Sequence, residues 1–537
     1  MDSMNRRKFF KIGSIGLTGL AAANLAGCSD DSNSGNSNRP NGPSRPSSPI
    51  NLNKDYRWGD TFTPETLALT PGTNTEEINL NWYSDRINPH DGIIKVRFFD
   101  YDKDFIEAAG SARDASAGKS AHKVTVKGLK ADTEYSYWVS DDGQNWSVEY
   151  TYRTPQKDKF RFATIGDPQL TQYRTSGQGM QDSTSKYPAP YTTTFWGWLE
   201  TMSNVGLKNV NFVAGVGDQV DLTGNGDETE YRYFFTPPEL RSIPWAPAIG
   251  NHDRHYPFRY HYNIPNELEF EPLLGSQYGN GTNQQYADVE AAGHYWYRYN
   301  NALFVVLNTS AYPASKADAA PYIERFDETL KAAKADSPGY TWLFVQHHKS
   351  TASVADHCAD RDIQYYVEAG FEALMTEHDV DFVLAGHDHV YARSYPLIGK
   401  KGGEPSEPDI ANGGGTITNP HGTIYVTMTT GSGLKYYDLY NQSGNLYVKN
   451  NDNYPYLAGG EAGSVPYMGG NDANTTSNKD TLPWTNYTGI LPLSNTECLQ
   501  SKIPSFTIVD VEGNKVTFNT YGCDAPSKSI DTFTVTK

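Results

Sequence analysis

The chain has 537 residues, with 45 lysines and arginines against 63 aspartates and glutamates, and its formal net charge is −18. This length allows more than one domain with its own hydrophobic core. The negative charge disfavours nucleic-acid binding, which needs a positively charged surface. Any phosphate site must therefore obtain positive charge locally, and bound metal ions would supply it.

The first 27 residues have the features of an export signal. A basic stretch at 5–11 is followed by a weakly apolar run at 12–23 and then by Leu-Ala-Gly before Cys28. This run is too short to span a membrane, so it predicts a signal peptide. Its paired arginines resemble a twin-arginine signal. Leu-Ala-Gly-Cys resembles a bacterial lipobox, which implies an exported lipoprotein, periplasmic or at the cell surface, anchored to the membrane through Cys28. The alternative is an ordinary secretion signal in which Cys28 has no role.

Residues 28–55 consist mainly of Ser, Asp, Asn, Gly and Pro. Such a segment buries too little apolar surface to offset its chain entropy, so we expect a flexible tether. Further along, Cys498 and Cys523 lie in one C-terminal region and could pair in an oxidising compartment. Cys358 is then the odd cysteine, which we interpret as a buried thiol.

Residues 56–155 show short alternating segments separated by turn signals. Examples are 78–83, 95–99 and the strand after the tight-turn signal Asp141-Asp142-Gly143. About seven strands in a stretch of this length predict a β-sandwich. Trp82, and the Leu-x-x-x-Thr-x-Tyr-x-Tyr pattern that starts at Leu129, resemble a fibronectin type III domain. The segment lacks a catalytic pattern, and we interpret it as a spacer or packing module.

From residue 160 onward, strand patterns alternate with helical ones and end in polar residues. The strands are followed in turn by Gly-Asp, Gly-Asp, Gly-Asn-His-Asp, Gln-His-His and Gly-His-Asp-His. They occupy residues 160–165, 211–216, 245–249, 340–345 and 382–385. Alternating strands and helices predict an α/β sheet, in which ligands gather beyond the carboxyl ends of the strands. We therefore expect these polar residues to converge on one site.

The last of these motifs, Gly386 to His389, contains two histidines. Residues two apart on a strand point the same way, so both imidazoles can reach one small volume. Two neutral imidazoles at a strand end suit a metal better than a proton relay. The alternative is a pair of surface histidines on a turn, but the other polar strand ends argue against it.

This order of motifs resembles the metallophosphoesterase (calcineurin-like) superfamily over about residues 160–395. The stretch from Val380 to Ser394, together with the sandwich that precedes the motifs, resembles purple acid phosphatases. Strand patterns near 506–518 and 531–533 resemble that family's closing strands. The resemblance implies a four-layer α/β/β/α sandwich, a mixed α/β (α+β) fold, over residues 160–537.

The resemblance also implies two metal ions about 3.5–4 Å apart that neutralise a phosphate ester and activate water. The expected metal ligands are Asp167, Asp218, Asn251, His347, His387 and His389. Asp218 would bridge the ions. His389 would join Asp167 on one ion, and His387 would join Asn251 on the other.

Further residues are expected at the substrate. By the resemblance, His252 contacts the phosphate or protonates the leaving group, and Asp221 orients it. His357 falls where purple acid phosphatases carry a substrate-contacting histidine. His255 and Tyr391 are candidates for lining the pocket. For His255 and His357 the alternative is a loop histidine without a role.

Three positions depart from the family pattern. Purple acid phosphatases have a tyrosine where this chain has Asp221, so we predict that the protein is not purple. Gln169 stands where the wider superfamily has histidine, and its amide could bind a metal or a water, which leaves Fe, Zn, Mn and Mg open. His347 and His348 face opposite ways on one strand; we favour His347 as the ligand and keep His348 as the alternative.

We therefore expect an exported phosphatase that hydrolyses a phosphorylated small molecule, a phosphomonoester, by metal-bound hydroxide. One alternative is phosphodiester hydrolysis at the same site. The other is a surface binding protein whose catalysis is weakened, for which Gln169 is the one argument. The near-complete set of expected ligands favours an enzyme.

Overall fold

The computed structural model describes residues 64–85, 95–100, 105–115, 118–171, 190–221, 228–253, 257–273, 289–353, 355, 357, 360–404, 406–409, 412, 415–433, 437, 498–499 and 503–537. All of these belong to one unit, Trp58–Lys537. The expected signal peptide and tether, with Cys28, and also His255 and Cys358, fall outside the described residues. Within the described residues, no helix has both the length and the apolar character that a membrane span requires.

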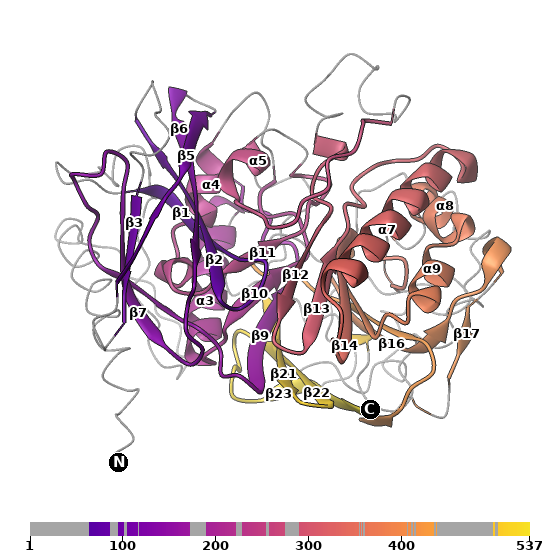
Figure 1. The fold of residues 1–537 in the computed structure, drawn as a ribbon. Helices are drawn as coiled ribbons and strands as arrows, with labels where there is room; N and C mark the ends of the chain where they lie inside the picture. Colours follow the sequence, from indigo (N-terminus) through magenta and orange to yellow (C-terminus); the bar gives the residue numbers. More distant parts are fainter. Residues whose placement is uncertain are drawn as a thin grey trace, which may run out of the picture. The chain divides into compact units, whose positions relative to one another are not determined.

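The N-terminal domain is a sandwich of two antiparallel sheets, drawn in indigo to purple in Figure 1. One sheet contains, in order, β1 (Glu65–Pro71), β2 (Glu77–Ser84), β6 (Ser120–Lys127) and β5 (Ser111–Asp114). The other contains β4 (Phe105–Ala109), β3 (Lys95–Phe99), β7 (Glu134–Ser140) and β8 (Tyr150–Arg153). Alternate side chains of these strands form one core, which includes Trp82, Phe98 and Tyr137. In the described residues the sandwich has eight strands, where the sequence predicts about seven.

The second domain contains two larger sheets. The first has the order β11 (Trp245–Pro247), β10 (Phe212–Gly215), β9 (Lys159–Ile165), β21 (Ser505–Glu512), β22 (Lys515–Gly522), β23 (Ser529–Thr536) and β18 (Thr416–Thr418). Strands β9, β10 and β11 are parallel, and β21 pairs with β9 in the antiparallel sense. The C-terminal strands therefore extend the sheet that begins the domain.

The second sheet has the order β12 (Tyr295–Tyr299), β13 (Ala302–Val306), β14 (Trp342–Lys349), β15 (Phe382–Gly386), β19 (Thr423–Thr427), β16 (Tyr391–Ile398) and β17 (Glu407–Pro408). The short β20 (Cys498–Leu499) pairs with β16. Strands β13, β14, β15 and β19 run parallel. Rings of Phe162, Phe304 and Phe344 pack between the two sheets.

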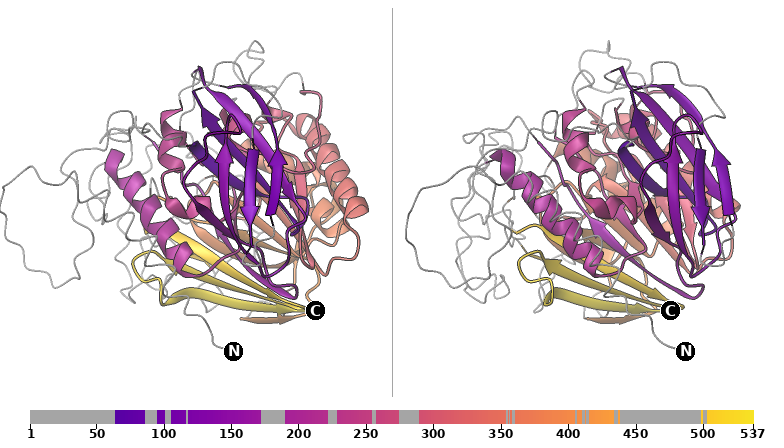
Figure 2. Two further views of the ribbon diagram at one scale, coloured as in Figure 1. Left: turned by 60° about the vertical axis from the view of Figure 1, so that its left-hand side comes forward. Right: turned by 90° about the vertical axis from the view of Figure 1, so that its left-hand side faces the viewer.

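Helices cover the outer faces of this pair of sheets. α7 (Lys316–Asp336), α8 (Arg361–Ala369) and α9 (Phe371–Glu377) lie against the second sheet, and α3 (Pro190–Leu207) lies on the side of the first (Figures 1 and 2). Ser315 caps α7 by accepting a hydrogen bond from the Asp318 amide at 3.1 Å. The predicted four-layer α/β/β/α arrangement is confirmed. Short helical turns complete the domain: α4 (Thr229–Phe234), η3 (Pro238–Arg241), α5 (Pro257–His261) and η6 (Lys401–Gly403).

The sandwich contacts the second domain through α4 and α5. The Tyr83 hydroxyl donates to Glu228 Oε1 at 3.2 Å, and His261 Nε2 donates to Glu228 Oε2 at 2.6 Å. Asn81 Nδ2 donates to the Tyr260 carbonyl at 2.7 Å. The bond from Asn81 holds α5 against the sandwich.

Cys523 is buried, and its Sγ lies 3.0 Å from Thr201 Oγ1. The side chain of Cys498 lies outside the described residues. A disulfide between Cys498 and Cys523 therefore remains a prediction.

Candidate metal centre

The candidate site lies where the two sheets bring the carboxyl ends of their parallel strands together. Strands β9, β10 and β11 are in register at their last residues, with Gly215 paired to Ile165 and to Pro247. The residues just beyond these ends include Asp167, Asp218 and Asn251. Strands β14 and β15 of the other sheet deliver the histidines. This convergence is what alternating strands and helices predict.

Left-handed backbone conformations mark these strand ends. Asp167 has φ 46°, Asp218 has φ 52°, His387 has φ 71° and His389 has φ 46°, and Gln169 has φ 43°. Non-glycine residues seldom adopt such values, which cost about 1–3 kcal/mol each and cluster at functional sites. The surrounding structure therefore holds the expected ligands in place at an energetic cost.

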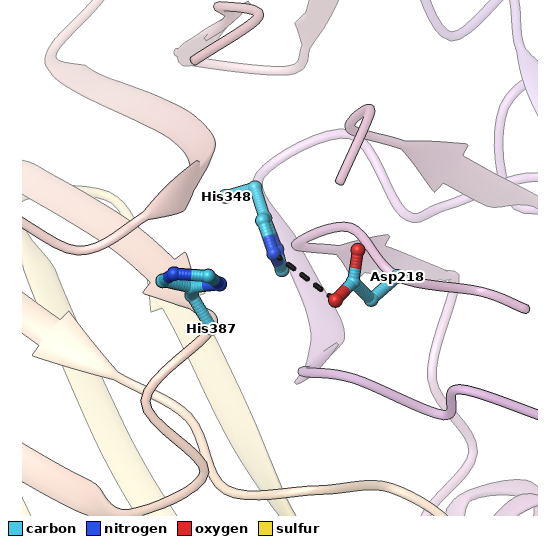
Figure 3. Close-up of side chains that lie close together, drawn as sticks. All are labelled: Asp218, His348 and His387. Atoms are coloured by element: carbon cyan, nitrogen blue, oxygen red, sulfur yellow. Dashed lines mark ion pairs between the residues drawn. The ribbon is translucent and has the colours of Figure 1, made fainter. Parts of the chain in front are cut away.

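Asp218 and His348 form the centre of the site (Figure 3). His348 Nε2 lies 3.2 Å from Asp218 Oδ2 and 2.9 Å from Asn251 Oδ1. His348 Nδ1 donates to the Val216 carbonyl at 2.9 Å. A carbonyl that holds one ring nitrogen as a donor leaves the other free to bind a metal. His387 approaches from the opposite side, and it forms with Asp218 and His348 a group whose donor atoms lie within 4.8 Å of one another.

Charge and burial oppose each other in this pair. Burial favours a neutral His348, but the carboxylates of Asp218 and Asp167 outweigh burial and raise the pKa of His348 to about 9. Burial likewise favours a neutral Asp218, yet His348 and His252 hold the pKa of Asp218 well below its ordinary value. A buried negative charge beside imidazoles is an arrangement that suits a cation.

Asp167 is fully buried and faces the same volume. Both its carboxylate oxygens accept the His387 amide, at 3.0 and 2.9 Å. His389 Nε2 lies 3.4 Å from Asp167 Oδ1. The glycines of the motifs allow this crowding: a Cβ on Gly386 would lie 2.4 Å from Asp167 Oδ2, and one on Gly250 would lie 2.0 Å from Asp218 Oδ1.

The geometry favours His348 as the ligand, which is the alternative to the predicted His347. The His347 ring packs edge-on against Phe371 of α9 at 4.9 Å, and its Nδ1 lies 3.3 Å from Thr309 Oγ1. Side chains alternate along β14, so His347 faces the helical layer while His348 faces the other sheet. Burial lowers the pKa of His347 to about 3. The alternation of side chains along a strand gives the same answer. His348 lies an even number of residues after Phe344, so both side chains point to the face that packs against the other sheet.

His252 sits at the edge of the site, with its side chain 18% exposed. Its amide donates to Asp218 Oδ1 at 2.9 Å, and its Nδ1 donates to the Asp221 carbonyl at 2.6 Å. Asp221 Oδ1 lies 3.3 Å from the same nitrogen. Asp221 therefore contacts the ring of His252 at Nδ1. The other ring nitrogen, Nε2, faces the candidate site and lies 3.9 Å from Asp218 Oδ2.

His357 also reaches the site. Its ring stacks on His387 at 4.1 Å, and its Nδ1 donates to Asp360 Oδ2 at 2.7 Å. Its amide donates to Asp388 Oδ1 at 2.7 Å. Asp388, the variable residue of the Gly-His-x-His motif, thus ties the loop of His357 to the turn that carries both histidines.

Tyr437 completes this side of the site. Its ring lies edge-on to His357 at 4.6 Å and to His389 at 5.1 Å. Tyr437 and Asp360 lie outside the sequence motifs, and Asp388 lies within one at its variable position, so none of the three was predicted as a site residue.

Asp253 ties two of the motif loops together. Its buried carboxylate accepts the Gln219 amide at 3.0 Å and the Gly250 amide at 2.9 Å. Burial and the charge of Asp218 raise the pKa of Asp253 to about 8. The position of Asp253 directly after His252 was visible in the sequence, but its role as a link between loops was not.

Tyr391 does not join the other candidates in the described structure. It is buried, and its hydroxyl donates to Asp531 Oδ2 on β23 at 2.5 Å.

Gln169 is fully buried, and neither atom of its side-chain amide has a hydrogen-bond partner among the described residues. Buried polar atoms are nearly always paired, so an orphaned amide indicates a missing ion or water.

The residues present fit a pair of metal ions. They offer carboxylates, an amide oxygen and imidazoles, which is a donor set suited to divalent ions, together with the orphaned amide of Gln169. The residues that would hold the pair are Asp167, Asp218, Asn251, His348, His387 and His389.

Two family matches agree with this geometry. Residues 64–154 match the family described as purple acid phosphatase, N-terminal domain, and residues 160–391 match the calcineurin-like phosphoesterase family. The second match begins at β9 and ends just beyond the Gly-His-x-His motif. The resemblance drawn from the motifs is therefore confirmed.

Individual relatives are distant. An uncharacterized protein of Mycobacterium tuberculosis is 23% identical over 346 residues, which cover 60% of this chain and 61% of that protein. A purple acid phosphatase of Glycine max is 22% identical over 317 residues, which cover 56% of this chain and 55% of the relative. These alignments span less than two thirds of each relative's length. The structure of a purple acid phosphatase from yellow lupin seeds has a TM-score of 0.54 and 16% identity, over 88% of this chain and 74% of that one, and so shares the fold.

Proposed function

We propose that this chain, which pairs a purple acid phosphatase N-terminal domain with a calcineurin-like phosphoesterase domain, is a metal-dependent phosphoesterase that acts on phosphomonoesters. The observation that carries the proposal is the convergence of two buried carboxylates with His348 and the Gly-His-x-His histidines. A pair of cations bound there would neutralise a phosphate and lower the pKa of a water.

The protein's own residues have separable roles in this reaction. Asp218 would hold metal through its carboxylate, which its contacts with His252 and His348 fix in place. Asp167 is held by the His387 amide. His252 and His357 lie at the exposed edge, where they can contact a phosphate oxygen or the leaving group.

The preference for monoesters rests on these two edge histidines. A monoester carries more negative charge than a diester, and His252 and His357 add donors on two sides of the centre. Phosphodiester hydrolysis remains the second candidate, because the metal ligands alone do not separate the two reactions.

The test is a panel of aryl monoesters and diesters, assayed with metal-replete protein and with an Asp218→Ala variant. Asp218→Ala should lower kcat/KM by about 1,000-fold or more, because it removes a carboxylate that would hold the metal. The matched control is Asp158→Ala, a change at an exposed aspartate directly before β9, at the opposite end of that strand from Asp167. Equal rates for Asp218→Ala and wild type would reject catalysis at this site. A faster diester reaction would replace the monoester proposal.

Export as a lipoprotein is a separate part of the proposal. It is supported by the twin-arginine pattern and by Leu-Ala-Gly before Cys28. Cells that express the full chain should incorporate a radioactive fatty acid into the protein, and Cys28→Ser should abolish the label. A Cys28→Ser protein that keeps the label would end the lipoprotein proposal without affecting the catalytic one.

A further inference from the structure

A second group of potential ligands lies beside the candidate metal centre. His357, Asp360 and His387 each offer one donor atom, and these atoms lie within 4.8 Å of one another. Two imidazoles and a carboxylate are a typical donor set for Zn²⁺. His387 belongs to this group and also to the group with Asp218 and His348.

Asp360 is placed unusually for its position in the chain. It is the N-cap residue of α8, where an aspartate normally accepts hydrogen bonds from the first turn of the helix. In this structure its side chain makes no capping hydrogen bond, and it accepts from His357 Nδ1 at 2.7 Å. Its carboxylate is therefore directed to the histidine pair.

The group is preorganised and can be reached from solvent. His357 is fixed by its amide bond to Asp388 and by its stack on His387, which is buried. The side chains of His357 and Asp360 are 16% and 33% exposed. A cation can therefore arrive from outside while the ligands keep their positions.

We propose that His357, Asp360 and His387 form a labile Zn²⁺ site that competes with the metal pair for His387. A cation entering this site takes the place of the hydrogen between His357 Nδ1 and Asp360 Oδ2, and the neutral imidazole then carries that hydrogen on Nε2. A neutral imidazole binds one cation at a time. A zinc ion bound to His387 in this site therefore prevents His387 from binding the ion of the metal pair that Asn251 would also hold. Excess zinc should therefore inhibit the enzyme, a consequence that rests on the proposed function.

The direct test is diffraction at the zinc absorption edge from crystals of the full chain with excess Zn²⁺. We expect an anomalous peak about 2.1 Å from His357 and Asp360, separate from any peaks beside Asp218. Asp360→Ser keeps a capping residue and removes the carboxylate, so it should lose this peak alone. Asp318→Ser, at the first turn of α7, is the control and should keep it. Wild-type crystals with zinc only beside Asp218 would overturn the proposal.

The solution test measures the activity of metal-replete enzyme against added Zn²⁺. The inhibition constant of Asp360→Ser should be at least tenfold higher than that of wild type and of Asp318→Ser. Equal inhibition of all three proteins would contradict the competition for His387. If no phosphate ester is hydrolysed, the proposed function fails, but the diffraction test still decides whether the zinc site exists.

Discussion

At the scale of single residues, the neighbouring histidines of β14 have opposite roles. His348 contacts Asp218 and Asn251, whereas His347 packs against Phe371 in the helical layer. We predict that His348→Ala lowers bound metal by at least half, because it removes a ligand, and that His347→Ala retains metal but unfolds more easily. Metal content per chain and thermal unfolding measure the two effects. Metal loss in His347→Ala with normal content in His348→Ala would reverse the assignment.

The orphaned amide of Gln169 gives a second prediction at this scale. If its amide faces an ion or an ordered water, Gln169→Leu should weaken metal binding at least tenfold. If the amide has no such partner, the same change should stabilise the protein by about 1–3 kcal/mol, since an unsatisfied buried polar group is removed. We expect the first result, measured by metal titration of the metal-free protein. Unchanged metal affinity with a higher melting temperature would contradict it.

At the scale of elements, α9 carries a buried acid, Glu372, whose Oε2 accepts a hydrogen bond from the Ser406 hydroxyl. Burial raises the pKa of Glu372 to about 7. The folded state therefore binds this proton more tightly than the unfolded state, so stability is full below about pH 4.5 and is lost as pH rises to about 7. The loss amounts to about 3 kcal/mol.

We predict that Glu372→Gln removes this part of the pH dependence. The variant should match wild type near pH 4.5 and exceed its unfolding free energy by about 3 kcal/mol above pH 7, because it carries no charge. Denaturant unfolding at several pH values measures the difference. A constant difference across this range would show that Glu372 is not the titrating group.

The strand ends show which parts of the fold and site could be predicted. Gly-Asp, Gly-Asn-His and Gly-His-x-His follow apolar strands, so convergence of Asp218, Asn251 and His387 could be expected from order alone. The contacts of Asp360, Asp388 and Tyr437 could not. They join loops from different parts of the chain, and local sequence patterns carry no information about such pairs. The choice between His347 and His348 depends on which face of β14 each side chain occupies. The resemblance to the family favoured His347, whereas the alternation of side chains along the strand favours His348.

At the scale of the whole molecule, the two domains share a buried polar contact. Glu228 is 4% exposed and accepts hydrogen bonds from Tyr83 of the sandwich and from His261 of α5. Two residues further on, Glu230 Oε2 accepts the amide of Asp221, which contacts His252. The sandwich is therefore connected to the edge of the candidate site through a short segment, an arrangement that agrees with a packing module.

We predict that Glu228→Ala destabilises the protein by about 3 kcal/mol, because it leaves the Tyr83 hydroxyl and the His261 ring buried without this partner. Calorimetry should show the sandwich unfolding before the second domain, while wild type unfolds in one transition. The control is Glu149→Ala, directly before β8, where an exposed glutamate accepts a hydrogen bond from the Ser136 hydroxyl of β7. Its melting temperature should stay within about 1 °C of wild type. If Glu228→Ala and Glu149→Ala behave alike, the sandwich and the second domain are not coupled through Glu228.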